Sequence, residues 1–136
     1  MRFRRAAGVV LVVAAIGSSA NCGANADRRA RELRRTAGSW AATLRTATDE
    51  WARDALPAHF VASTIDVARQ ELTREGDRVR SQSGAGASAA ADEVLAALTP
   101  LRAAVERGDR GSAIAVAHAV ADRIPSEPTP PVARPQ

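Results

Sequence analysis

The feature that most constrains this chain is the spacing of its apolar residues, which alternates between four and three positions over long stretches. Residues spaced this way line one side of an α-helix and form the seam of a helical bundle or coiled coil. The first stretch predicts one long helix over residues 27–54. Its seam consists of Leu33, Ala37, Trp40, Leu44, Ala47 and Trp51.

The same spacing predicts three more helices, over residues 57–80, from residue 87 onward, and over residues 110–124. No long stretch alternates with the period of two that a half-buried strand would show. The connections are short, which favours antiparallel neighbours. The predicted fold class is therefore all-α: an up-and-down antiparallel bundle of four helices, or of three helices with a loose fourth. The inward positions are Val61, Ile65, Ala68, Leu72, Glu75 and Val79, then Ala91, Val94, Leu98, Leu101 and Val105, then Ile114, Ala117, Ala121 and Ile124.

Proline and glycine mark the expected helix ends. Pro57 suits the first turn of the second helix, because its missing N–H has no partner there. Residues 81–86 read as a flexible connection. Pro100 should kink or restart the third helix, with Thr99 as an N-cap. Gly108 is a natural stop, and Asp109 is a natural N-cap for the fourth helix.

The N-terminus has the three-part layout of a bacterial secretory signal. Arg2, Arg4 and Arg5 precede an uncharged apolar run over residues 6–16, and small residues follow. The run is too short to span a bilayer, which takes about 20 residues. We expect residues 1–26 to form a signal region, residues 27–124 a bundle domain, and residues 125–136, which are rich in proline, a disordered tail.

Two positions are candidates for the processing site. Ala24-Asn25-Ala26 is an A-x-A cleavage site, and cleavage after it would leave a mature chain without cysteine. The other candidate is Cys22, because Ser19-Ala20-Asn21-Cys22 resembles the lipobox of bacterial lipoproteins in its cysteine and in the small Ala20. That resemblance implies lipid attachment at Cys22. The sequence leaves open a lipid-anchored protein, a freely secreted one and an uncleaved anchor.

The charge distribution does not predict nucleic-acid binding. The net charge of +4 includes Arg2, Arg4 and Arg5, so the chain beyond the signal region is nearly balanced. One cluster of basic residues stands out just after Cys22, and lipid attachment there would bring it beside anionic head groups. The alternative is a solvated helix surface. The cluster consists of Arg28, Arg29, Arg31, Arg34 and Arg35.

A second candidate contact surface lies around the junction of the first two helices. Trp51, Leu56 and Phe60 gather there. They form either a hydrophobic plug at that end of the bundle or a docking patch for a partner or an apolar ligand.

No residue pattern predicts catalysis, a cofactor or a bound metal. Residues 84–89 match G-x-G-x-x-A, but a dinucleotide site needs a strand before it, and here a charged helix precedes it. His59 and His118 are expected at different heights of the bundle, and His118 with Asp122 gives too few ligands for a closed site. The paired carboxylates Asp49-Glu50 and Asp92-Glu93 point to different helix faces.

The sequence thus predicts a small exported protein of the bacterial envelope that acts as a helical interaction or structural module and not as an enzyme. Its partners would be a membrane surface, a second copy of the chain, or another helical protein. The alternative function is a ligand- or metal-carrying bundle of the periplasm or cell surface.

Overall fold

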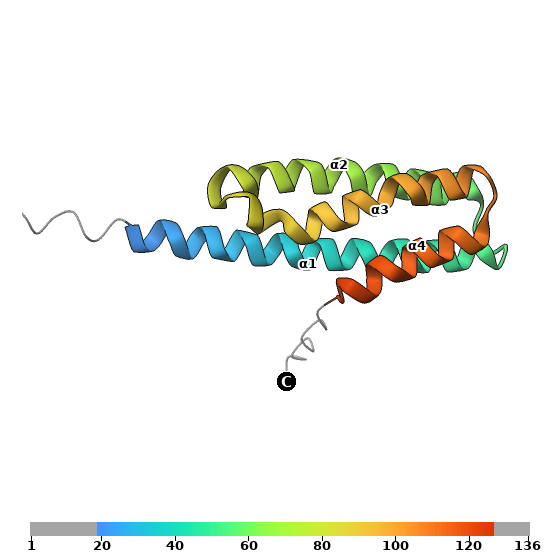
Figure 1. Cartoon of the computed structure of the whole chain (residues 1–136), viewed down its shortest axis with the longest axis horizontal. Coiled ribbons are helices and arrows are strands. Elements are labelled where there is room, and N and C mark those ends of the chain that lie inside the picture. The colour runs from blue at the N-terminus through green and yellow to red at the C-terminus, as the bar shows by residue number, and fades with distance from the viewer. Residues whose placement is uncertain (1–18, 127–136) are drawn as a thin grey trace, which may run out of the picture.

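The computed structural model describes residues 19–126, and within that range it contains four α-helices and no strand. The helices are α1 (Ser19–Ala52), α2 (Ala58–Ser83), α3 (Ala89–Glu106) and α4 (Arg110–Arg123), with a short 3-10 helix η1 (Ala85–Ser88) before α3. Consecutive helices pack side by side, and α4 closes the ring against α1 (Figure 1). The predicted all-α bundle is confirmed.

The core is formed by the seam residues that the spacing predicts, with a small rotation of the stripe. Ala41 and Thr48 of α1 are buried, whereas Trp40 is only half-buried. A straight helix has 3.6 residues per turn, so its inward face drifts away from a strict seven-residue repeat. In α2 the same drift buries Gly76 beside the half-buried Glu75. In α4 Ala113 and Val120 are buried, and Ile114 and Ala121 are half-buried.

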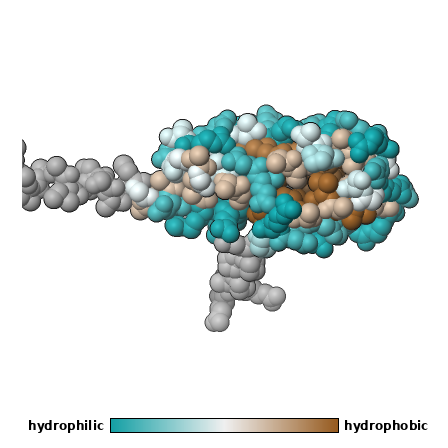
Figure 2. Space-filling model, in the orientation of Figure 1, coloured by the Kyte–Doolittle hydropathy of each residue, from teal (hydrophilic) through white to brown (hydrophobic). Residues whose placement is uncertain are grey.

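Hydrophilic residues cover most of the face seen in Figure 2, with apolar residues visible between the helices. Many of the charged side chains pair across neighbouring helices. Arg102 donates to Asp66 across 2.5 Å and to Glu106 across 2.8 Å. These two carboxylates raise the pKa of the Arg102 guanidinium above its ordinary value. Such exposed pairs each contribute only about 0–1 kcal/mol. The stability of the fold therefore rests on the core.

The connection from α1 to α2 and the connection from α3 to α4 lie at one end of the bundle, and both begin with the same C-terminal capping motif. The N–H groups of Asp54 and Ala55 bond to the carbonyls of Trp51 and Glu50, which is a Schellman motif with Asp54 in the left-handed region at φ 62°. α3 ends in the same way, with Gly108 at φ 69°. The predicted stop at Gly108 is confirmed.

Asp109 caps α4 as predicted. Its Oδ1 accepts a hydrogen bond from the Ser112 backbone N–H at 3.0 Å. Hydrogen bonding from Ser112 holds the pKa of this carboxyl below its ordinary value, because the charged form is the better acceptor. The cap is thus in place wherever Asp109 is ionised, and it weakens as the pH falls through that lowered pKa.

Two of the predicted helix boundaries, a restart at Pro100 and an end at residue 80, are wrong. α3 does not restart at Pro100 but continues through it. Pro100 and Ala96 are both exposed, so water can reach the Ala96 carbonyl that loses its partner, while the buried Leu98 and Leu101 hold the helix on both sides. The connection predicted over residues 81–86 is shorter, since α2 runs to Ser83 and Gly84 alone precedes η1.

α1 extends well beyond the part of the bundle core against which it packs. It begins at Ser19, ahead of the predicted start at residue 27, and Leu33 is the first residue of α1 seen to be buried. None of residues 23–32 is buried. We call residues 23–32 the N-terminal extension of α1.

α4 is the shortest of the four helices and determines where the bundle opens. It has 14 residues, against 34 in α1, so at about 1.5 Å per residue it spans only about 21 Å. Beyond it the chain crosses α1 at Gly38, where an added Cβ would lie 3.1 Å from the Pro125 carbonyl oxygen and 3.2 Å from the Ser126 Cα. Within residues 19–126, the bundle is therefore four helices thick along α1 residues 39–52, with α1 counted as one of the four. Along the part of α1 that precedes Gly38 it consists of α1, α2 and α3 only.

The core assignment predicts unequal effects for two aromatic residues. Trp51 is 6 % exposed and Phe60 is 49 % exposed. Trp51→Ala should lower the free energy of unfolding by about 3–5 kcal/mol, because it leaves a cavity in the core. Phe60→Ala is the control and should lower it much less. Urea unfolding followed by circular dichroism measures both, and equal losses would contradict the assignment.

The crossing at Gly38 predicts a second difference. Gly76→Ala should raise the free energy of unfolding by about 0.5–1 kcal/mol, the usual gain for a glycine inside a helix, because the nearest atom to the new Cβ is the Arg80 Nη2 at 3.9 Å. Gly38→Ala should gain less or lose stability, because Pro125 and Ser126 must move. Equal stabilisation of the two variants in the same urea experiment would show that the crossing is not tight.

Candidate functional site

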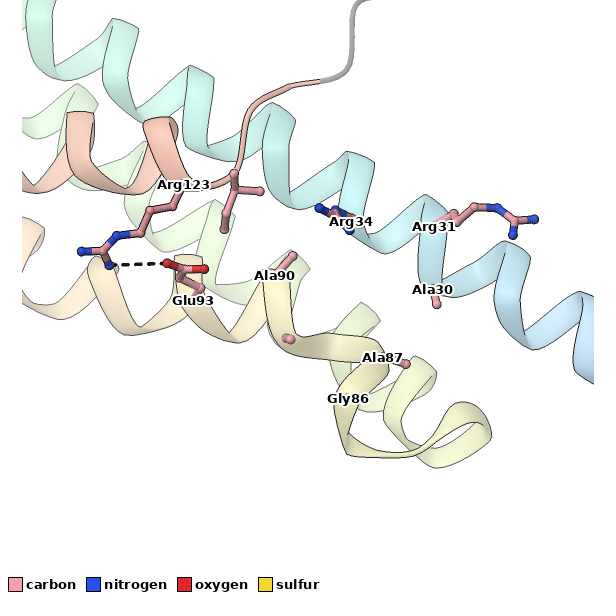
Figure 3. Close-up of a pocket in the computed structure, with 10 residues that line it drawn as sticks. Ala30, Arg31, Arg34, Gly86, Ala87, Ala90, Glu93 and Arg123 are labelled. Carbon is pink, nitrogen blue, oxygen red and sulfur yellow. Dashed lines mark hydrogen bonds and ion pairs between the residues drawn. The ribbon is translucent and has the colours of Figure 1, made fainter.

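A groove opens where the four-helix part of the bundle gives way to three helices. It lies between α1, the start of α3 and the end of α4, and has a volume of about 410 Å³. Figure 3 shows that its lining residues come from all three helices and from η1. They are Ala30, Arg31, Arg34, Gly86, Ala87, Ala89, Ala90, Glu93, Arg123 and Ile124.

Small residues keep the groove open. Ala30 from α1 and Ala87 and Ala90 from the opposite side are each half-buried and pack against the core. An alanine side chain ends at Cβ, so facing alanines leave space that leucine or phenylalanine would fill. Ile124 closes the groove at the end of α4.

The charges around the groove are mostly positive. Arg31 and Arg34 come from α1 and Arg123 from the last turn of α4, whereas Glu93 is the one acidic residue among the lining residues. Arg123 Nη1 lies 3.4 Å from Glu93 Oε1, where Arg123 is exposed and Glu93 is partly exposed (Figure 3). This pair is weak. Within residues 19–126, neither Arg31 nor Arg34 has a hydrogen-bond or ion-pair partner.

The arginine cluster predicted from the sequence does not form a single face. Arg29 donates to Gln82 and so lies on the α2 side of α1. Arg28 pairs with Glu32 along α1 at 3.2 Å, and Arg35 is exposed. Only Arg31 and Arg34 line the groove. The structure thus divides the cluster between two sides of α1.

Trp51 and Phe60 are also separated. The Trp51 ring belongs to the core, and the Arg110 guanidinium lies 5.7 Å from its centroid. Arg110 also binds both carboxylate oxygens of Asp54 and the Ala52 carbonyl, which ties the end of α1 to the start of α4. Phe60 remains at the surface of α2, and Leu56 is half-buried against the core.

The histidines and carboxylates are arranged in separate pairs. His118 of α4 lies 2.8 Å from Asp49 of α1, whereas His59 is exposed on α2. Asp122 pairs with Arg45 at 3.4 Å and not with His118. Across residues 19–126, no three His, Cys, Asp or Glu side chains come together as a metal site would require.

Cys22 lies in the first turns of α1, on the same helix as the groove arginines. At about 1.5 Å per residue, the Cα atoms of Arg31 and Arg34 lie about 14 and 18 Å from it along the helix axis.

The apolar run over residues 6–16 and the tail beyond Ser126 fall outside the described residues. None of the helices within residues 19–126 combines the length and apolar character needed to cross a bilayer.

Comparison with models of protein families, with curated proteins and with solved structures finds no match for this chain. The site must therefore be judged from its own residues. Sequence reasoning identified Arg31 and Arg34 but missed Arg123 and Glu93. A usable signal was present, since the predicted fourth helix is about half as long as the first and must leave part of it uncovered.

Proposed function

We propose that this chain is an exported protein of the bacterial cell envelope that acts as a non-catalytic helical interaction module. In this proposal it is held at the membrane by lipid attached to Cys22, and the alternative is release after cleavage at Ala26. The signal-like N-terminus and the lipobox-like residues 19–22 support export and tethering.

The observation that carries the proposal is the pair of unpartnered arginines near Cys22. Arg45, Arg80 and Arg102 pair with carboxylates. The exposed Arg69 and Arg74 of α2 also lack such a partner within residues 19–126, so the position of Arg31 and Arg34, and not the missing partner alone, distinguishes them. Arg31 and Arg34 have no such partner among residues 19–126, and they lie within about 20 Å of Cys22 along α1. An anchored Cys22 would bring both guanidinium groups close to anionic head groups, where each contributes about 1 kcal/mol of attraction.

The N-terminal extension of α1 is compatible with either processing site. Residues 23–32 contribute no buried side chain, so residues 23–26, which cleavage after Ala26 would remove and cleavage before Cys22 would keep, include no core residue. The extension would act as a short stalk between an anchor and the bundle. The connections at residues 53–57 and 107–109 would then face away from the membrane, together with Phe60.

The intact mass of the mature chain tests the proposal. We expect the chain expressed in a secreting bacterial host to appear in the membrane fraction, starting at Cys22 and carrying added acyl mass. Cys22→Ser is the matched variant and should lose the acyl mass. A high-salt wash should then release it from the membrane fraction, because salt screens electrostatic attraction but does not extract an acyl chain.

Two results would count against the proposal. A chain that starts at Asp27 without added mass, and that Cys22→Ser leaves unchanged, would overturn the tether. A chain that keeps Met1 and stays in the cytoplasm would overturn export altogether.

A further inference from the structure

We infer that the groove between α1, α3 and α4 is a binding site for the phosphodiester head group of an anionic phospholipid. The inference names the partner of the site described above and rests on the proposed function. Three observations support it: the charge of the groove, its shape, and its position relative to Cys22.

The charge of the groove selects an anion. The lining residues include three arginines, Arg31, Arg34 and Arg123, and one acidic residue, Glu93, which pairs with Arg123. Two guanidinium groups therefore have no carboxylate to satisfy them within residues 19–126. Guanidinium groups match phosphate oxygens well because they present several N–H donors in one plane.

The shape of the groove favours a small head group over a flat protein surface. Its volume of about 410 Å³ lies within the range of about 300–1,000 Å³ typical of small-molecule sites. Ala30, Ala87 and Ala90 leave room next to the arginines, and Ile124 adds an apolar wall. A phosphate could bind at the arginines while the glycerol part lies against the alanines.

The position of the groove identifies the source of the phosphate. An acyl chain on Cys22 would keep the groove within about 20 Å of the lipid surface along α1. There the local concentration of phosphodiester head groups greatly exceeds that of any free phosphate compound. A membrane lipid is therefore the ligand that this placement favours.

Vesicle sedimentation tests the inference without the lipid anchor. The mature chain that begins at residue 22 and carries Cys22→Ser cannot be acylated, and it lacks the arginines and the apolar run of residues 1–16. Its binding therefore comes from neither the acyl chain nor the signal region. It should bind vesicles of equal parts phosphatidylglycerol and phosphatidylcholine, and not vesicles of phosphatidylcholine alone. Adding Arg31→Gln and Arg34→Gln should weaken the binding by roughly 30-fold, since each arginine contributes a factor of about five.

Two further variants separate the groove from general attraction to a charged surface. Arg69→Gln with Arg74→Gln removes the same charge from exposed positions on α2 and should weaken binding far less. Ala30→Leu keeps every charge but fills the groove, and it should weaken binding while leaving the helical circular dichroism unchanged. Equal losses in the two arginine double variants, or full binding by Ala30→Leu, would overturn the groove as the site.

The remaining outcomes are also decisive. Absence of binding to either kind of vesicle would overturn the inference, even if the mass experiment establishes lipid attachment at Cys22. Binding of glycerol 3-phosphate as tight as binding to the vesicles would assign the groove to a soluble phosphate compound instead. If the mass experiment finds no acyl group on Cys22 of the unmodified chain, but the vesicle experiment still shows binding that depends on the groove, the groove assignment stands and only the tether is removed.

Discussion

The close passage of the chain over Gly38 is the contact on which the rest of the arrangement depends. Pro125 and Ser126 approach the α1 backbone so closely at Gly38 that a side chain there would have to displace them. Pro125 and Ser126 follow the short α4 and lie across α1 instead of extending the helix alongside it. If the chain continued along α1 instead, a fourth helix would fill the space between α1 and α3. The groove exists because α4 ends where it does.

The composition of the core allows this geometry. Ala37, Ala41 and Ala47 of α1 and Ala113 and Ala117 of α4 are all buried, so these two helices, which pack against each other, contribute many small side chains to the core. The largest fully buried side chains are Leu44, Ile65, Leu72, Leu98 and Leu101. Close approach of backbones compensates for small side chains, because dispersion contacts depend on distance as much as on size. The same use of alanine at the end of the bundle, without a fourth helix to cover it, leaves an open groove.

Much of the fold could be predicted from the sequence, because the bundle is specified by a repeated local pattern. The seams of α2 and α3 follow the predicted positions almost throughout, and Gly108 and Asp109 act as predicted. The errors occur where tertiary contacts override local preference. Leu98 and Leu101 hold α3 together across Pro100, and the start of α1 lies in a region where no apolar seam exists to predict it.

For the same reason, only the arginines that α1 contributes to the groove could be predicted from the sequence. The density of arginines after Cys22 is visible in the sequence, but the sequence does not show that Arg29 reaches Gln82 of α2 while Arg31 and Arg34 line the groove. Arg123 joins them only because of where α4 stops. Its contribution depends on the helix lengths and on the crossing at Gly38, and no local pattern around residue 123 encodes either.

The most direct test of this account is amide hydrogen exchange along α1. Protection from exchange reports how strongly each segment is held by its packing. The account predicts a stepwise decrease: strongest protection at residues 41–51, where four helices pack, weaker protection at residues 33–40, and least at residues 23–32, where no side chain is buried. Protection that stays uniform from residue 23 to residue 51 would contradict it, since the first part of α1 would then be covered as fully as the last.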